Sequence, residues 1–451
     1  MRAFEPLQSA GKAATGQPRP TLRIRDVVAI TVGIVIGAGI FRTPSLVAGA
    51  AGSADMLLLA WAAGGVLSII GALCYAELAA IEASAGGDYH YLMRAFGQRL
   101  AFLYAWARLS VIQTGSIALL AFIFGDYATQ ILSLGPLSSA IYGALVILVI
   151  TTLNWIGVHF GARAQNSLTI IEVLGLLLVI AAGLLLAPAA PSEIAATSES
   201  AFGLMMVFVL LTFGGWNEAV YVSAELRDSR RRMGWAMILS LLIVTVLYLL
   251  INLAYLRVLA IPGMAGSDAV AADVMDRAFG PGGAAVISVL IAVAALTSAN
   301  ATAITGARST YALGRNFPLL RWLGTWNGER GTPANALIVQ GAVALLLVLG
   351  GSFSRDGFQA VVEYSAPVFW FFFLLVGISL FVLRWRNPGA ERPFRVPLYP
   401  LLPAIFCLTC VYLLYSSLAY TGPGALAGVT TVALGGFLLL FLKPAIPEEM
   451  N

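Results

Sequence analysis

The sequence predicts an all-α polytopic membrane protein with twelve transmembrane helices. Hydrophobic residues make up 59% of the 451 residues and charged residues 11%, a balance that a soluble domain does not need. Twelve apolar runs are long enough to cross a bilayer, and nothing of soluble-domain size remains between them. The runs cover residues 26–50, 56–82, 101–133, 138–158, 166–188, 203–225, 233–258, 282–307, 334–350, 357–384, 397–418 and 423–443.

Lys and Arg residues are distributed unevenly between the two sides of these runs. Most lie in the N-terminal segment, in the even-numbered loops or at Lys443 in the C-terminal tail. Because positively charged loops stay in the cytoplasm, both termini are predicted to be cytoplasmic. The net charge of +4 then reflects topology and indicates no nucleic-acid-binding patch. The first run is too long for a cleavable signal peptide, so none is expected.

The order of the runs predicts an internal repeat. The first and sixth runs each contain a central glycine cluster, and the runs that follow them correspond in order. Five runs are an odd number, so the second copy crosses the membrane in the opposite direction. We therefore predict a first repeat over residues 26–188, a second over 203–384 and two extra helices over 397–443. Residues 1–25 and 444–451 are the predicted cytoplasmic tails.

The connection after the seventh run predicts a short amphipathic helix on the outer surface. Val270, Val274 and Phe279 alternate with aspartates over residues 268–279. Apolar and charged faces of this kind favour a helix lying in the membrane interface. The glycine and proline residues at 280–283 are expected to end it.

The two glycine clusters predict helix breaks near the middle of the membrane. Gly37 and Gly214 each lie about eleven residues into their runs, about 16 Å deep at 1.5 Å per residue. A helix opened there exposes N–H groups that suit a carboxylate and carbonyl groups that suit an ammonium. Paired breaks in inverted copies predict a site for a small zwitterion. The alternative is that glycine serves only close helix packing.

Glu172 is an ionisable residue inside the fifth run. It shares one helix face with Gln165 and Thr169, and a carboxyl at this depth should face protein or water. One hypothesis is a proton site or a monovalent cation site coupled to transport. The other is a structural carboxyl bonded to a neighbouring helix.

Other polar residues inside the runs carry weaker predictions. Asn300 and Thr302 lie in a polar stretch of the eighth run and could complete an ion site, touch substrate or form helix–helix contacts. Glu77 and Arg108 are expected to be structural ion pairs or snorkelling side chains. The only histidines, His90 and His159, lie in loops. We therefore expect no enzyme activity, no metal site and no cofactor.

The sequence resembles the amino acid–polyamine–organocation superfamily, and in particular bacterial permeases near the L-type amino acid transporters. The resemblance covers nearly the whole chain. It implies a LeuT-type fold, amino acid transport by alternating access and a location in the bacterial inner membrane. The matching stretches are Gly33–Phe41, Cys74–Leu78 with Gly86–Tyr89, Phe213–Asn217, Asn300–Arg308 with Gly314–Arg315, and Arg392–Pro397.

The resemblance also implies which residues bind the substrate. It places the substrate carboxylate and ammonium against the first break and closes the site with the second. Leu211 and Thr302 match positions where relatives carry aromatic side chains, and Ala38 replaces a common serine. The predicted substrate-binding residues are Ile36, Gly37, Ala38, Gly39, Ile40, Leu211, Phe213, Gly214, Gly215, Asn217, Asn300 and Thr302.

Two departures from the family pattern change the expected mechanism and partners. Relatives commonly carry a lysine at the position of Glu172, so a carboxyl there reverses the charge. Members with a disulfide-linked heavy chain bond it through a cysteine in the third loop, whereas residues 131–139 contain none. Cys74, Cys407 and Cys410 all fall inside apolar runs, so no disulfide-linked partner is expected.

We therefore predict a secondary transporter for amino acids. Neither break contains a charged residue, although Glu218 is adjacent, so neutral amino acids are favoured. Proton-coupled symport and amino acid exchange remain alternatives for the mechanism. The competing functions are a membrane sensor that binds an amino acid without moving it, and a carrier of amines or cationic amino acids.

Overall fold

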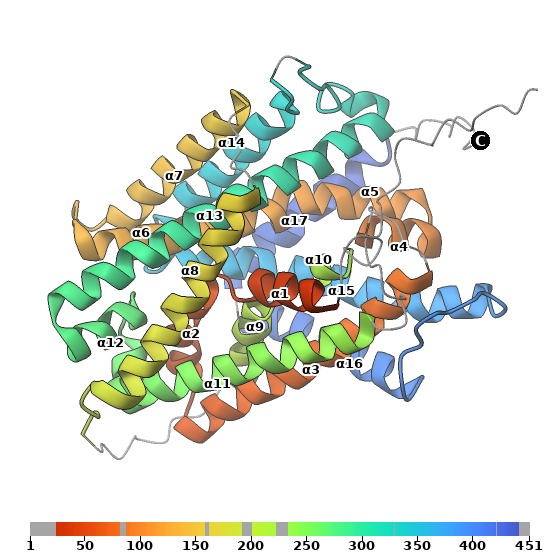
Figure 1. The fold of residues 1–451 in the computed structure, drawn as a ribbon. Coiled ribbons are helices and arrows are strands. Elements are labelled where there is room, and N and C mark those ends of the chain that lie inside the picture. The colour runs from red at the N-terminus through yellow and green to blue at the C-terminus, as the bar shows by residue number, and fades with distance from the viewer. Residues whose placement is uncertain are drawn as a thin grey trace, which may run out of the picture.

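The computed structural model describes residues 24–81, 87–157, 162–191, 201–221, 233–328, 330–420 and 422–441. These residues form long helices and one isolated bridge between Asn327 and Thr332. The helices lie side by side in a single bundle (Figure 1). The predicted all-α class is confirmed.

The helices follow the order of the predicted runs. The first run contains α1 (Ile24–Val35), the 3₁₀ turn η1 (Ala38–Phe41) and α2 (Thr43–Ala50). The elements from the second to the fifth run are α3 (Ala54–Ile81), α4 (Gly87–Phe96), α5 (Gln98–Ala107), the π-helical turn η2 (Arg108–Ile112), α6 (Gln113–Ile131), α7 (Ser138–Trp155), α8 (Ala162–Ala181) and the π-helical turn η3 (Ala182–Leu186).

The second half repeats the pattern of one broken helix followed by longer ones. The sixth run contains α9 (Phe202–Thr212) and α10 (Trp216–Tyr221). The remaining elements are α11 (Met233–Ala265), α12 (Val270–Phe279), α13 (Pro281–Asn316), the 3₁₀ turn η6 (Pro318–Leu320), α14 (Ala334–Gly351), α15 (Gly357–Arg386), α16 (Leu401–Tyr420) and α17 (Gly422–Leu438).

Within the described residues, 8 helices are long and apolar enough to cross a membrane. Shorter apolar helices cover Ile170–Leu186, Phe202–Thr212 and Gly422–Leu438. Together with the broken first helix they account for the predicted runs. The bundle is held by long helix pairs: α13 packs along α6, α3 along α11, and α15 along both α16 and α17 (Figure 1).

An ion pair at one end of α3 fastens three parts of the chain. The Glu77 side chain is fully buried and accepts hydrogen bonds from Arg384 Nε at 2.7 Å and Arg384 Nη2 at 2.5 Å. Its carboxylate also accepts from the backbone N–H of Val396 at 2.6 Å. A buried carboxylate needs such partners. Glu77 is thus a structural ion pair that joins α3, α15 and the segment before α16.

The predicted short amphipathic helix is present as α12, with two corrections. Val270 and Val274 are buried, but Phe279 is 51% exposed instead of lying on the apolar face. Gly280 ends the helix with a φ of 73°. Pro281, however, begins α13 instead of extending the turn, because proline is tolerated in the first turn of a helix.

Candidate functional site

The first predicted break is present and separates α1 from α2. The α-helix ends at Val35, Gly37 is extended with a φ of −101° and a ψ of 174°, and a 3₁₀ turn runs from Ala38 to Phe41. Among the described residues, the backbone N–H groups of Ala38 and Gly39 have no backbone acceptor. Unpaired N–H groups at the start of a helical turn favour a negatively charged ligand group.

The second break separates α9 from α10. The α-helix ends at Thr212, and the Gly214 N–H donates to the Leu211 carbonyl at 3.0 Å, which closes a tight turn. Gly215 has a φ of 102°, and a Cβ built on it would lie 2.9 Å from Ile34 Cγ2 of α1. Glycine is therefore required here both by the backbone conformation and by the close approach of the two broken helices.

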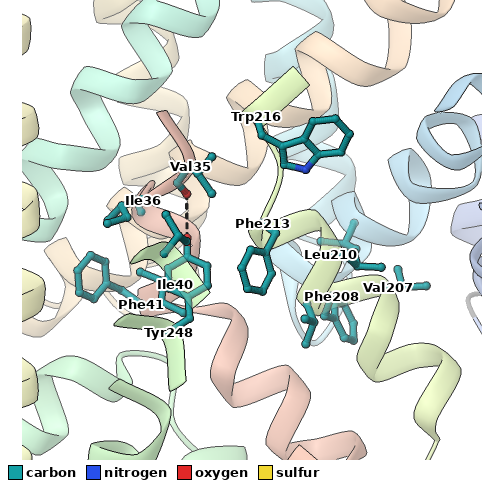
Figure 2. Packing of buried hydrophobic residues seen from close by; sticks show 14 of the residues in the cluster. Val35, Ile36, Ile40, Phe41, Val207, Phe208, Leu210, Phe213, Trp216 and Tyr248 are labelled. Atoms are coloured by element: carbon teal, nitrogen blue, oxygen red, sulfur yellow. Dashed lines mark hydrogen bonds between the residues drawn. The ribbon is translucent and has the colours of Figure 1, made fainter. Parts of the chain in front are cut away.

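Tyr248 of α11 connects the two breaks. Its hydroxyl donates to the carbonyl of Val35, where α1 ends, at 2.8 Å (Figure 2). The Thr212 carbonyl, where α9 ends, lies 3.3 Å from the same hydroxyl. The ring packs edge-on against Trp61 and tilted against Phe213, with centroid distances of 5.5 and 4.9 Å. The single hydroxyl hydrogen thus bonds the end of α1, and the same oxygen lies close to the end of α9.

A cavity of about 300 Å³ lies between the breaks. This volume is at the small end of the range for sites that hold small molecules. Eight of the predicted residues line it, all with small or polar side chains except Leu211. They are Gly37, Ala38, Gly39, Leu211, Gly214, Gly215, Asn217 and Thr302.

Four other predicted substrate-binding residues lie outside this lining. Ile36, Ile40 and Phe213 are fully buried in the apolar core beside the breaks (Figure 2). Apolar side chains that flank a break lower the free energy by packing into the core, whereas the small residues between them leave backbone facing the cavity. Asn300 instead accepts a hydrogen bond from Asn154 Nδ2 at 2.6 Å, which is a contact between α13 and α7.

Glu172 lies in α8 outside the cavity lining. Its side chain is 7% exposed, and its Oε1 has no hydrogen-bond partner in the part of the chain that the structure describes. Its helix α8 packs against α11, the helix that carries Tyr248. The side chains of Gln165 and Thr169, predicted to share its face, lie outside the described residues.

Four charged or polar side chains line part of the cavity and bond to one another in a row. The sequence analysis did not predict that they would lie together. Arg108 Nη2 lies 3.2 Å from Glu218 Oε1, and Arg108 Nη1 donates to the Tyr104 hydroxyl at 3.2 Å. That hydroxyl donates to Asp88 Oδ2 at 3.0 Å. All four residues line the cavity. Arg108 and Glu218 stood out in the sequence individually, but nothing local indicated that η2 and α10 would place them together.

Arg108 also begins the π-helical turn η2. Turns of this type widen a helix by one residue and are frequent at functional sites. On the next turn, Gln113 Nε2 donates to the Thr302 carbonyl at 2.9 Å and to Thr305 Oγ1 at 3.1 Å, which joins α6 to α13. The part of the cavity wall formed by η2, α6 and α13 is thus polar and fixed by hydrogen bonds.

The sequence matches the amino acid permease family over residues 22–438. It is 32% identical to the rat b(0,+)-type amino acid transporter 1 over 442 residues, covering 94% of this chain and 89% of the relative. It is 29% identical to the human cystine/glutamate transporter over 420 residues, covering 90% and 82%. It is 30% identical to the mouse large neutral amino acids transporter small subunit 2 over 405 residues, covering 86% and 74%.

These relatives are transporters and not enzymes. The family match covers nearly the whole chain, and the helices, the two breaks and the cavity all lie within it. The chain therefore belongs to the amino acid permease family of the amino acid–polyamine–organocation superfamily, among the relatives of the L-type amino acid transporters.

Proposed function

We propose that this protein is a secondary active transporter of neutral amino acids that works by alternating access. The observation that carries the proposal is the cavity of about 300 Å³ bounded by two interrupted helices. The N–H groups of Ala38 and Gly39 provide donors for the α-carboxylate of a substrate. Carbonyl groups near the ends of α1 and α9 provide acceptors for its ammonium. The similarity to the mouse large neutral amino acids transporter small subunit 2 supports the same substrate class.

A thermal-shift screen of the purified protein against the twenty amino acids tests the substrate class. A ligand that binds only the folded state raises the melting temperature. Counterflow of the labelled hit into liposomes then separates a carrier from a sensor. Accumulation of labelled amino acid inside liposomes that were loaded with unlabelled amino acid supports transport. Binding without counterflow would contradict transport and favour the sensor.

We further propose that Glu172 couples transport to a proton or to a monovalent cation. Its buried carboxylate oxygen without a partner among the described residues supports a role in taking up a cation. A change in its charge would act on α11, the helix against which α8 packs and whose Tyr248 hydroxyl bonds the end of α1.

Uptake into liposomes with and without an imposed pH gradient tests the coupling. We expect the wild type to respond to the gradient and Glu172→Gln to respond at least about tenfold less. The amide keeps the size of the side chain but cannot ionise. If the pH gradient changes uptake by neither protein, the proposal of proton coupling through Glu172 is wrong. Amino acid exchange is then tested with liposomes that contain amino acid inside.

Glu218 favours a second candidate function, the transport of cationic amino acids or amines. Its side chain is 39% exposed, and the described charged residues that line the cavity are Asp88, Arg108 and Glu218. Their formal charges leave one negative charge in excess, which attracts a cationic side chain. If cationic substrates are carried, Glu218→Gln should lower transport of lysine relative to leucine by about tenfold. Glu391→Gln, the same change at an exposed site outside the cavity, should leave the ratio unchanged.

A further inference from the structure

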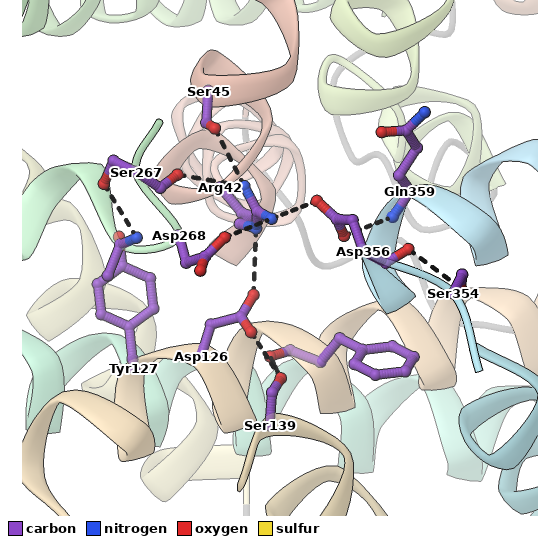
Figure 3. Close-up of polar contacts among 12 residues, drawn as sticks. Arg42, Ser45, Asp126, Tyr127, Ser139, Ser267, Asp268, Ser354, Asp356 and Gln359 are labelled. Atoms are coloured by element: carbon purple, nitrogen blue, oxygen red, sulfur yellow. Dashed lines mark hydrogen bonds and ion pairs between the residues drawn. The ribbon is translucent and has the colours of Figure 1, made fainter. Parts of the chain in front are cut away.

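The buried guanidinium of Arg42 uses all five of its N–H donors (Figure 3). The side chain is 3% exposed and lies between η1 and α2. Its acceptors come from segments far apart in the sequence. They are Asp126 Oδ2 at 3.1 Å, Ser45 Oγ at 3.1 Å, the Ser267 carbonyl at 3.4 Å, Asp268 Oδ1 at 3.2 Å and Asp356 Oδ2 at 2.5 Å.

The three carboxylates are themselves anchored to different helices. Asp126 of α6 accepts from the Ser139 hydroxyl of α7 at 2.5 Å. Asp356 accepts from the Gln359 N–H at 3.0 Å and so caps the start of α15. Asp268 lies in the connection between α11 and α12. Arg42 therefore ties α2 to α6, to α15 and to the α11–α12 connection at a single point.

This cluster lies between two cavities. Arg42, Asp268 and Asp356 line a second cavity of about 420 Å³, whereas Thr43, the next residue along the chain, lines the central one. Phe208 lines both cavities. The Arg42 guanidinium lies 5.9 Å from the centroid of the Phe358 ring, which lines the central cavity. Arg42, Phe208 and Phe358 thus form the layer that separates the two cavities.

The charges of the cluster do not balance. One guanidinium faces three carboxylates, so the carboxylates would repel one another without it. Among the residues that the structure describes, no group of His, Cys, Asp or Glu is arranged to hold a metal ion. Removing one partner from a buried ionic cluster leaves uncompensated charge, which drives the remaining groups apart or into water. The closed position of α2, α15 and the α11–α12 connection therefore depends on Arg42.

We propose that Arg42, Asp126, Asp268 and Asp356 form a gate that separates the central cavity from the second cavity during transport. The exposed fractions of the aspartates indicate which bonds break first. Asp268 is 76% exposed and Asp356 23%, whereas Asp126 is 12% exposed. Opening exchanges the bonds from Arg42 to Asp268 and Asp356 for water that enters from the second cavity. The role as a transport gate rests on the proposed transport function.

Distance measurements between spin labels test the gate directly. Phe353, which precedes α15 and is 84% exposed, and Asp276, which is exposed on α12, are changed to Cys for labelling. The three native cysteines are replaced by alanine. We expect one predominant distance with Arg42 present. Arg42→Gln should lengthen the mean distance and populate a second, open arrangement, and Arg42→Lys should give an intermediate distribution, because an ammonium cannot satisfy all five acceptors.

Arg355→Gln is the matched control, because it removes the same charge from an exposed residue beside Asp356 that is not part of the cluster. It should leave the distances unchanged. Arg42→Gln should also lower amino acid counterflow at least tenfold while keeping the thermal shift caused by bound amino acid. That combination separates a gate from a binding residue.

Unchanged distances in Arg42→Gln would overturn the gate, whether or not the melting temperature falls. A lower melting temperature with unchanged distances would mean that the cluster only fastens the fold. The proposed function fails separately, if the wild type shows neither binding nor counterflow. The distance distributions still decide whether Arg42 holds the two cavities apart.

Discussion

Gly37 and Gly215 each lie in one of the two helix breaks, but their surroundings constrain them differently. Gly37 has an extended backbone that any residue can adopt, and a Cβ built there meets nothing within 4 Å. Gly215 has a φ of 102° and lies against Ile34. The first glycine keeps space open for a ligand, and the second allows the chain to turn.

Alanine substitutions should therefore separate the two roles. Gly215→Ala is expected to destabilise the fold by about 1–3 kcal/mol, because a left-handed conformation and a close contact are imposed on a side chain. Gly37→Ala should keep the melting temperature but weaken amino acid binding by about tenfold, because its methyl group enters the cavity. Melting curves with and without amino acid measure both effects. Equal melting temperatures for the two variants would contradict the assignment.

At the same scale, the sequence predicted which backbone segments open and only some of the side chains that line the cavity. Ile36 and Ile40 were predicted to bind substrate but are buried in the core, since the direction of side chains around a helix break cannot be read from residue types. Arg42 was not predicted at all. Its aspartate partners lie 84, 226 and 314 residues away, so only the tertiary fold brings them together.

At the scale of elements, α11 holds the two broken helices at a fixed separation through Tyr248. This contact could not be predicted, because α11 reads as an ordinary apolar run with no local feature at that position. The glycine clusters, in contrast, predicted both interruptions, since glycine in the middle of an apolar run lowers helix stability wherever the run lies.

Removing the Tyr248 hydroxyl should loosen both breaks. In Tyr248→Phe the ring still packs against Trp61 and Phe213, but the Val35 carbonyl loses its side-chain donor. We expect a loss of stability of about 1–3 kcal/mol and at least a tenfold loss of counterflow. Tyr255→Phe, which removes a buried hydroxyl from the same helix outside the breaks, is the matched control. Similar losses in both variants would contradict a special role for Tyr248.

At the scale of the whole molecule, apolar run length predicted the fold class because a bilayer demands helices of membrane length. The predicted ends of the helices were less accurate. The structure extends α13 to Asn316, beyond the predicted end at 307, because polar residues continue this helix past the apolar region. In α11, Ala260 has a φ of 54° and interrupts the helix close to the predicted end at 258. The helix α4 is too short and polar to be predicted as an apolar run. The division into repeats at 26–188 and 203–384 stays a prediction.

The whole chain is expected to transport without a disulfide-linked partner. Cys74 lies buried in α3, and Cys407 and Cys410 lie in α16, of which Cys410 is buried. We expect the chain reconstituted alone to show counterflow. Replacing all three cysteines by alanine should change the rate by less than about twofold, since no disulfide is lost. Loss of counterflow in the folded triple variant would indicate that a thiol is needed.

Phe208 has a consequence for leakage through the protein. Its ring forms part of the wall of both hollows, and it stands on α9, one turn before that helix stops at Thr212. If α9 tilts during the proposed transport cycle, Phe208 moves with it, and we expect the volume gained by one cavity to be lost by the other. Under this proposal, no continuous path for water and ions opens while the substrate crosses.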